Sequence, residues 1–175
     1  VRSLVGSEMC IRDSSITEGF WLREEHRGWE LEGKTIGIIG YGNTGKSFAK
    51  KLQGFNDVEV LCYDILEGVG DLAAEQVSLK ELLKKAQVIS LHIPETSKTL
   101  GFINKKCIDK MHHPFWLINP ARGKVIITEE LVEGLKTRKI LGAGLDVLEY
   151  ESSSFYSIFK SDKQNSALSL SLIHI

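Results

Sequence analysis

The sequence predicts an α/β fold, a doubly wound parallel sheet that is incomplete at both ends of the chain. Three observations predict it: apolar segments alternate with amphipathic ones, the apolar segments lack a polar face, and a glycine-rich turn joins the first of them to a helix. Strands that are apolar on both faces are typical of a parallel sheet covered by helices on two sides. Right-handed crossovers between such strands give a doubly wound sheet.

Five apolar segments, each ending near a polar residue, glycine or proline, are expected to be strands. They are residues 35–40, 58–63, 88–92, 115–119 and 140–147. Helices are expected at residues 15–27, 46–52, 78–86, 104–111 and 128–139. Ser78 and Glu81 have the spacing of a capping box, and Glu129 and Glu130 place acids where the dipole of the last helix favours them. The predicted strand order is 3-2-1-4-5, which places residues 88–92 outside residues 58–63.

A glycine-rich turn follows the first strand and opens the next helix. Gly40, Gly42 and Gly45 form a G-x-G-x-x-G pattern. The first glycine permits a tight turn, the second lets the backbone approach a pyrophosphate, and the third allows close packing of helix on strand. The amides and the positive dipole end of that helix then face the phosphates. In this context the pattern predicts a dinucleotide cofactor in a Rossmann fold.

The second strand ends in Asp64, about 20 residues after the last glycine of the pattern. A carboxylate at this point accepts hydrogen bonds from both ribose hydroxyls of an adenosine, and it repels a 2′-phosphate. Ile65 and Leu66 follow it, so no Arg is at hand to bind such a phosphate. NAD is therefore favoured over NADP as the cofactor.

Composition excludes several classes of protein. The chain has 42% hydrophobic residues, 26% charged residues and a net charge of −1, which argues against disorder and against a nucleic-acid partner. No apolar run approaches the roughly 20 residues of a membrane span, so no membrane partner is expected. Cys62 and Cys107 are expected to be ordinary thiols of a cytoplasmic protein, and no Cys/His spacing indicates a metal site.

The two ends of the chain are expected to be foreign to the natural protein. Residues 4–14 match the translation of a transposon-end adapter used to build sequencing libraries, and residues 170–175 match the same oligonucleotide in the opposite orientation. We therefore expect an adapter-derived leader (1–14), a partial cofactor-binding domain (15–169) and an adapter-derived tail (170–175). The alternative is a flexible leader and a short apolar tail. On the adapter interpretation, Cys10 and His174 are not site candidates.

Ligands of such sheets bind across the carboxyl ends of the strands, and polar residues follow the fourth and fifth strands. Arg122 could hold a substrate carboxylate through two parallel hydrogen bonds, although a lone Arg after a strand is more often a solvated surface residue. Asp146 could orient the carboxamide of a nicotinamide. Either Glu149 or Glu151 could hold a catalytic imidazole in position, or both could belong to a solvated acidic loop.

Taken in order, these motifs resemble the cofactor domain of D-isomer-specific 2-hydroxyacid dehydrogenases, especially phosphoglycerate dehydrogenase-like members. The resemblance covers about residues 29–151 and includes the glycine turn, Asp64, residues 91–94, residues 119–123 and residues 144–147. It implies hydride transfer between NAD and a small 2-hydroxy or 2-oxo acid. It also implies that the intact parent is a homodimer.

The resemblance assigns roles to individual residues. It implies that Arg122 binds the carboxylate and the carbonyl of the substrate, and that Glu151 supports a catalytic His. Glu149 is then a bystander. In the family the His follows a sixth strand, and no matching Pro-His turn occurs before the expected adapter residues. We therefore expect the 175-residue chain itself to be inactive.

The same resemblance implies the remaining cofactor contacts. The amides of Asn43 and Thr44 meet the pyrophosphate, and Ile93 and Ala121 line the cofactor cleft. Pro120 stands where the family usually has a small or hydroxylated residue. Because proline has no N–H, any donor role of that backbone position is lost.

Two other functions stay open. One is an NAD-sensing regulatory or corepressor-type protein built on the same domain, since a fold does not fix a function. The other is a different NAD-dependent enzyme, such as a hydrolase of adenosyl thioethers. An S-adenosylmethionine methyltransferase fits less well, because the glycine spacing and Asp64 suit a dinucleotide better.

Overall fold

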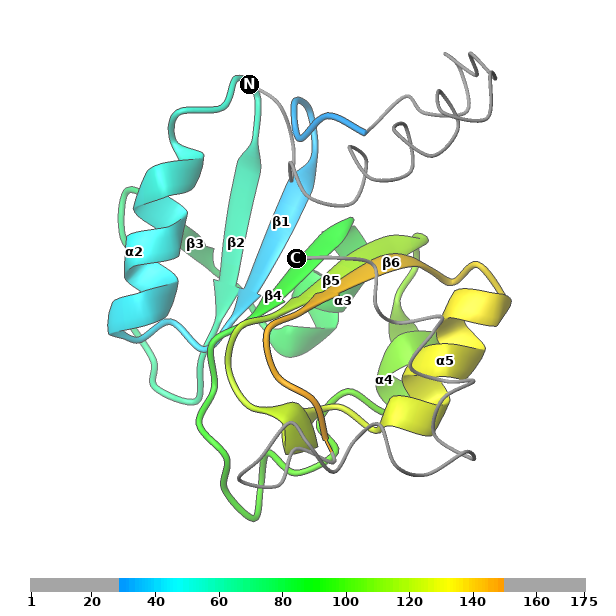
Figure 1. Cartoon of the computed structure of the whole chain (residues 1–175). Coiled ribbons are helices and arrows are strands. Elements are labelled where there is room, and N and C mark those ends of the chain that lie inside the picture. Colours follow the sequence, from blue (N-terminus) through cyan, green and yellow to red (C-terminus); the bar gives the residue numbers. More distant parts are fainter. Residues whose placement is uncertain (1–28, 150–175) are drawn as a thin grey trace, which may run out of the picture.

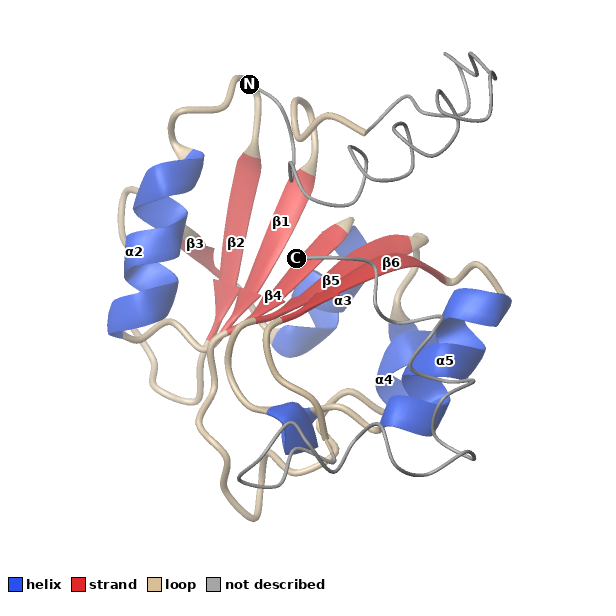
Figure 2. Ribbon diagram, viewed as in Figure 1, coloured by secondary structure: helices blue, strands red, loops and turns tan. Residues whose placement is uncertain are grey.

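The computed structural model of the 175-residue chain describes residues 29–149 as a parallel sheet with helices on both faces (Figures 1 and 2). Its strands are β1 (Thr35–Ile39), β2 (Glu59–Tyr63), β3 (Glu75–Gln76), β4 (Val88–Leu91), β5 (Phe115–Asn119) and β6 (Ile140–Leu145). Its helices are α2 (Asn43–Leu52), α3 (Leu79–Lys85), α4 (Lys105–Lys110), the short 3₁₀ helix η1 (Gly123–Val125) and α5 (Thr128–Lys136). The predicted fold class is confirmed. The expected helix at 15–27, the expected adapter residues and Glu151 lie outside the described residues.

The sheet has the order β3-β2-β1-β4-β5-β6, and every pair of neighbouring strands is parallel. The predicted place of residues 88–92 outside residues 58–63 is therefore wrong. β4 pairs with β1 instead, with Ile36 opposite Val88. The edge beyond β2 is taken by β3, a two-residue strand that was not expected. After β3 the chain crosses to the other face of the sheet, and this crossover makes the sheet doubly wound.

The core has two layers, one on each face of the sheet. On one face, Ala49 and Leu52 of α2 pack against Ile38 and Val60. On the other face lie α3, α4 and α5, and their buried residues pack against strands β1, β4, β5 and β6. Figure 1 shows the same division, with α2 apart from the other helices. Successive side chains of a strand point to opposite faces, so β1 and β4 contribute to both layers.

Side chains cap the starts of α3 and α4, while α2 begins at Asn43, earlier than the expected residue 46. Ser78 Oγ accepts a hydrogen bond from Glu81 N at 3.2 Å, as the capping spacing predicts. Asn104 Oδ1 accepts from Cys107 N at 3.0 Å, so Asn104 caps α4 and is not its first residue. The expected extension of α5 to residue 139 is wrong. The helix ends at Lys136, because Arg138 has a φ of 58°, in the left-handed region.

Within residues 29–149, no helix is both long enough and apolar enough to cross a membrane. The same part of the chain holds no group of His, Cys, Asp and Glu side chains arranged for a metal ion. Cys62 and Cys107 are free thiols, and burial raises the pKa of each to about 11. Cys62 is buried as expected, whereas Cys107 is half-buried.

Candidate functional site

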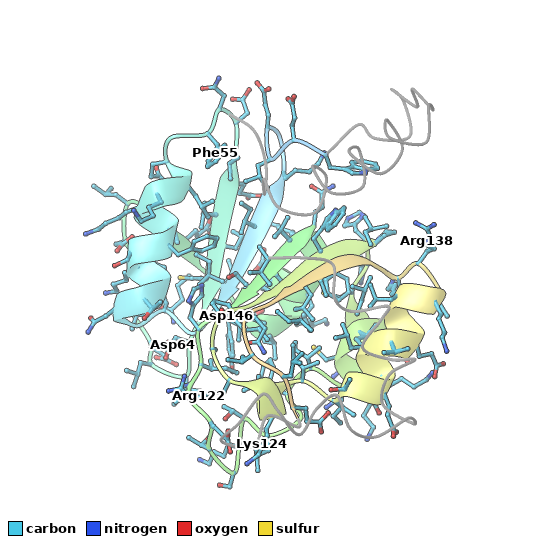
Figure 3. All side chains as sticks on the ribbon, in the orientation of Figure 1. Phe55, Asp64, Arg122, Lys124, Arg138 and Asp146 are labelled. Atoms are coloured by element: carbon cyan, nitrogen blue, oxygen red, sulfur yellow. The ribbon has the colours of Figure 1, made fainter. Side chains whose placement is uncertain are left out.

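The predicted site residues gather where the parallel strands end. Figure 3 shows Asp64, Arg122 and Asp146 at one end of the sheet, while Phe55 and Arg138 lie at the other. The two ends differ because the carboxyl ends of parallel strands share one edge. Asp64 follows β2, Arg122 follows β5 and Asp146 follows β6. The topology therefore brings together residues that are far apart in the sequence.

Gly40 and Gly45 are required by contacts of the glycine turn. Gly40 has a φ of +93°, and a Cβ there would lie 2.6 Å from the backbone oxygen of His92. A Cβ on Gly45 would lie 2.3 Å from the backbone oxygen of Gly40. Both distances are shorter than any real Cβ contact, so each position excludes a side chain. These two glycines let α2 start directly against the end of β1.

Gly42 and the first residues of α2 face open space. A Cβ on Gly42 would meet no atom within 4 Å. Gly42 is the N-cap of α2, and it offers no side chain to the helix. The first bond of the helix runs from Lys46 N to Gly42 O at 2.9 Å, so the amides of Asn43, Thr44 and Gly45 precede the intrahelical ladder. The first turn holds no acidic residue. Such a helix end is suited to bind an anion such as a pyrophosphate.

Asp64 is held by backbone amides on both of its oxygens. Oδ2 accepts from Tyr41 N at 2.7 Å, and Oδ1 accepts from Leu66 N at 3.0 Å. A carboxylate has about four acceptor positions, so two remain for ribose hydroxyls. The Tyr41 amide belongs to the glycine turn, so the turn and the carboxylate are one unit.

The end of β4 forms a wall beside the glycine turn. His92 N donates to Ile39 O at 2.7 Å, and a Cβ on Gly40 would lie 2.8 Å from Cγ2 of Ile93. The His92 ring lies against Phe48 of α2, with ring centroids 5.4 Å apart. Its Nε2 shares a hydrogen bond of 2.9 Å with Oγ of the buried Ser90. Burial lowers the pKa of His92 below its usual range, so its neutral form predominates near pH 7.

The turn after β5 is shaped by the side chain of Asn119, which is fully buried. Asn119 Oδ1 accepts from Ala121 N at 3.1 Å, and Nδ2 donates to Arg122 O at 2.9 Å. The turn is thereby closed on both sides of Ala121. Arg122 itself is exposed, and Nη1 of its guanidinium donates to Ala121 O at 2.7 Å. Pro120 is exposed.

The segment after β6 packs directly on this turn. Asp146 N donates to Asn119 O at 3.1 Å, which places the exposed Asp146 beside the Arg122 turn. A Cβ on Gly123 would lie 1.9 Å from Leu148 O, so this glycine permits the close approach of the two segments. Glu149 Oε2 accepts from Thr128 N at 2.7 Å. Glu149 thus caps α5, whose N-cap residue Ile127 provides no side-chain bond.

Comparison with known proteins identifies the family. The sequence model described as "D-isomer specific 2-hydroxyacid dehydrogenase, NAD binding domain" matches residues 6–170. The chain belongs to this family. It is 41% identical over 137 residues to the hydroxypyruvate reductase of Thermotoga maritima, covering 78% of this chain and 44% of that protein. It is 38% identical over 147 residues to the D-3-phosphoglycerate dehydrogenase of Archaeoglobus fulgidus, covering 81% of this chain and 27% of that protein.

Solved structures agree with the sequence comparison. The D-lactate dehydrogenase of Aquifex aeolicus, solved with NAD and lactic acid, superposes with a TM-score of 0.78 at 34% identity. The match covers 93% of this chain and 50% of that one, so the chain spans about half of the relative. The predicted family, its phosphoglycerate dehydrogenase-like relatives and the predicted cofactor NAD are confirmed. The open space at Gly42 and the free acceptor positions of Asp64 fit this cofactor.

Sequence reasoning missed three residues that shape the site. Tyr41 was seen only as a spacer between glycines, yet its amide holds Asp64. Asn119 was noted only as part of a motif, yet its amide side chain builds the Arg122 turn. Glu149 was considered only as a possible support for a catalytic imidazole or as a solvated residue, and its role as a cap of α5 was not foreseen. A buried Asn directly before a turn is a signal that sequence alone could have given, because Asn side chains commonly bond backbone two residues on.

Proposed function

We propose that this domain serves an oxidoreductase that transfers hydride between NAD and the C2 carbon of a D-2-hydroxy or 2-oxo acid. The supporting observation is the junction at Asn119, where the Arg122 turn and Asp146 meet at the same end of the sheet as Asp64. A cation and an acid at the carboxyl ends of the strands support binding of a small acid and a nicotinamide there, because ligands of a Rossmann fold bind at that edge. The names of the relatives, a hydroxypyruvate reductase and a D-3-phosphoglycerate dehydrogenase, agree with such substrates.

The residues of the chain have distinct roles in this proposal. Arg122 binds the carboxylate of the acid and polarises its carbonyl oxygen, which gains negative charge in the transition state. Asp146 orients the nicotinamide carboxamide. The cofactor, when bound, would supply the hydride for reduction of the 2-oxo acid and accept it in oxidation of the 2-hydroxy acid. Glu151 supports the imidazole that moves the hydroxyl proton, and that imidazole comes from the rest of the parent protein.

Binding of the cofactor is distributed over backbone and side chains. The amides of Asn43 and Thr44 bind the pyrophosphate at the start of α2. Asp64 accepts the ribose hydroxyls and disfavours a 2′-phosphate. Ile93 and Ala121 line the cleft on either side of the nicotinamide.

Two measurements test the proposal. Calorimetry on the 175-residue chain should detect NADH binding, and Asp64→Asn should weaken it and narrow the preference for NADH over NADPH. An absence of any NADH binding would overturn the cofactor assignment. In the full-length gene product, Arg122→Lys should lower kcat/KM for a 2-oxo acid at least about tenfold, because Lys cannot form the two parallel bonds.

The same assay separates the alternatives. A full-length protein that binds NADH but reduces no 2-oxo acid would favour the NAD-sensing regulator. We also propose that the intact parent is a cytoplasmic homodimer and that the natural segment runs from residue 15 to residue 169. Light scattering on the full-length protein tests the first of these, and the sequence of the flanking genomic DNA tests the second.

A further inference from the structure

Tyr41, in the glycine turn, donates hydrogen bonds to two aspartates of the loop between β2 and β3. It is the middle residue of the first G-x-G, and its side chain is only 1% exposed, within the core cluster under α2. Its hydroxyl donates to Asp71 Oδ1 at 2.7 Å. Its backbone amide donates to Asp64 Oδ2, also at 2.7 Å. Tyr41 therefore binds the β2–β3 loop at two points, at its first residue, Asp64, and at Asp71.

Asp71 is a well-fixed acceptor for the Tyr41 hydroxyl. Its Oδ1 also accepts from Ala73 N at 2.8 Å, and its backbone pairs with Ala74 through bonds of 3.1 and 3.3 Å. The hydrogen bond from Tyr41 is the main reason why the pKa of Asp71 is lowered, so its carboxylate is charged near neutral pH. Hydrogen bonds to a charged acceptor are about twice as strong as neutral ones.

Neighbouring contacts hold the loop and the ring in place. Lys46 Nζ lies 5.6 Å from the centre of the Tyr41 ring, in the arrangement of a cation–π contact. Gln76 of β3 donates to Leu66 O at 2.7 Å and accepts from Val69 N at 2.9 Å. These two bonds hold the part of the loop before Asp71 against β3, and the part after Asp71 leads directly into β3. The loop forms a rigid anchor for the phenol.

We propose that Asp71 is a positioning residue for cofactor choice: it holds Tyr41, and Tyr41 holds the Asp64 carboxylate in the orientation that selects a 2′-hydroxyl over a 2′-phosphate. This proposal rests on the proposed NAD-binding function. The reason is geometric. With the phenol anchored, the Tyr41 amide fixes Oδ2 of Asp64, and the remaining acceptor positions point in set directions. Without the hydrogen bond between Tyr41 and Asp71, the glycine turn can shift, and the Asp64 carboxylate can rotate while it keeps its hydrogen bond from Leu66 N.

The test measures affinities for NADH and NADPH by fluorescence titration of the 175-residue chain. Tyr41→Phe and Asp71→Ala should each weaken NADH binding about fivefold, the size expected for one positioning hydrogen bond. NADPH binding should change less than about twofold, because the Asp64 carboxylate, once it is held less strictly, also repels the 2′-phosphate less. The NADH preference should therefore fall in both variants. The double variant should be no worse than either single one, since both remove the same interaction.

Conservative and matched variants separate positioning from general stability. Asp71→Asn should restore most of the NADH preference, because its amide oxygen still accepts the phenol. Tyr63→Phe is the control for the hydroxyl, since the described residues give the Tyr63 hydroxyl no hydrogen bond. Asp109→Ala, at an exposed position of α4, is the control for the carboxylate. Neither control should alter the ratio of the two affinities.

Two outcomes would overturn the inference. The first is a proportional loss of NADH and NADPH binding in Tyr41→Phe and Asp71→Ala, which indicates an ordinary structural bond. The second is unchanged hydrogen-exchange protection of the residue-41 amide in Tyr41→Phe and Asp71→Ala, since the inference predicts faster exchange in both variants and not in Tyr63→Phe. This measurement needs no bound cofactor. It therefore tests the positioning role even if the chain binds neither cofactor, a result that would refute the proposed function.

Discussion

Gly45→Ala should lower the stability of the domain, whereas Gly42→Ala should weaken NADH binding and leave stability nearly unchanged. Both substitutions add one methyl group to the same turn. At Gly45 the new Cβ would lie 2.3 Å from Gly40 O, so backbone must move by most of an ångström. Overpacking of this kind costs about 1–3 kcal/mol. Ala is better than Gly in a helix by about 1 kcal/mol, which offsets part of that cost. The net expectation is a loss of about 1–2 kcal/mol of stability.

At Gly42 the methyl group meets nothing within 4 Å, and the φ of −80° suits any residue. Ala is a poorer N-cap than Gly, but it also reduces the entropy of the unfolded chain by about 0.4–1 kcal/mol. These effects nearly cancel, so stability should change by less than about 0.5 kcal/mol. The methyl group would instead occupy the space where a pyrophosphate approaches α2. NADH affinity should fall at least about tenfold.

Thermal unfolding with and without NADH measures both effects in one assay. Gly45→Ala should lower Tm by several degrees, on the order of 3–8 °C, in the absence of NADH. Gly42→Ala should keep the wild-type Tm without NADH but show a smaller upward shift with it. At a hundredfold excess over the wild-type Kd, NADH stabilises the wild type by about 2.7 kcal/mol and a variant with tenfold weaker binding by about 1.4 kcal/mol. Equal losses of Tm in the two variants, or a full NADH shift in Gly42→Ala, would refute this account of the turn.

Three further predictions use the same unfolding assay. Glu149→Ala should cost about 1 kcal/mol by removing the cap on Thr128 N, whereas Glu129→Ala, at an exposed position in the first turn of α5, should cost less than half of that. Gly123→Ala should cost about 2–3 kcal/mol because its Cβ would meet Leu148 O, while Gly144→Ala, which meets nothing within 4 Å, should be nearly neutral. Burial lowers the pKa of His92 below its ordinary 6.5, so the unfolded chain binds the proton more readily, and stability should fall as pH drops below about 6.5. His92→Gln should reduce this dependence and exposed His112→Gln should not; an unchanged profile in His92→Gln would contradict it.

The fold was largely predictable because apolar strands and glycine spacing are local signals. Strands β1, β2, β4 and β5 lie within one residue of the expected ranges, since their side chains are buried on both faces. β3 was missed because it consists of Glu75 and Gln76, whose pairing with β2 leaves no apolar pattern in the sequence. Missing one edge strand shifted the strand order. Residues 88–92 were counted as the third strand and placed at the edge, whereas they form β4 and pair with β1, so the predicted order is wrong.

The parts of the site that could not be predicted are bonds between distant segments. The backbone amide of Tyr41 donates a hydrogen bond to Asp64, and that of Thr128 donates one to Glu149. No local pattern distinguishes an acidic residue that caps a remote helix from one that is merely solvated. Burial of Tyr41 was equally hidden, because a large side chain between two glycines is usually assigned to a loop. These bonds depend on which segments lie side by side, and the predicted strand order placed residues 88–92 wrongly.

The geometry of Arg122 suits its proposed role, because its backbone is held in place while its side chain is left exposed. The backbone of its turn is rigid, because the Asn119 side chain holds it at Ala121 N and Arg122 O. The side chain is exposed, and its one hydrogen bond within the described residues goes to a neutral oxygen, that of Ala121. Such a bond contributes about 0.5–1.5 kcal/mol, whereas bonds between charged partners contribute about 1.5–3 kcal/mol each. If Arg122 has the proposed role, a substrate carboxylate that accepts two bonds from the guanidinium outweighs the bond to Ala121 O, and the exchange needs only side-chain rotation on a fixed turn.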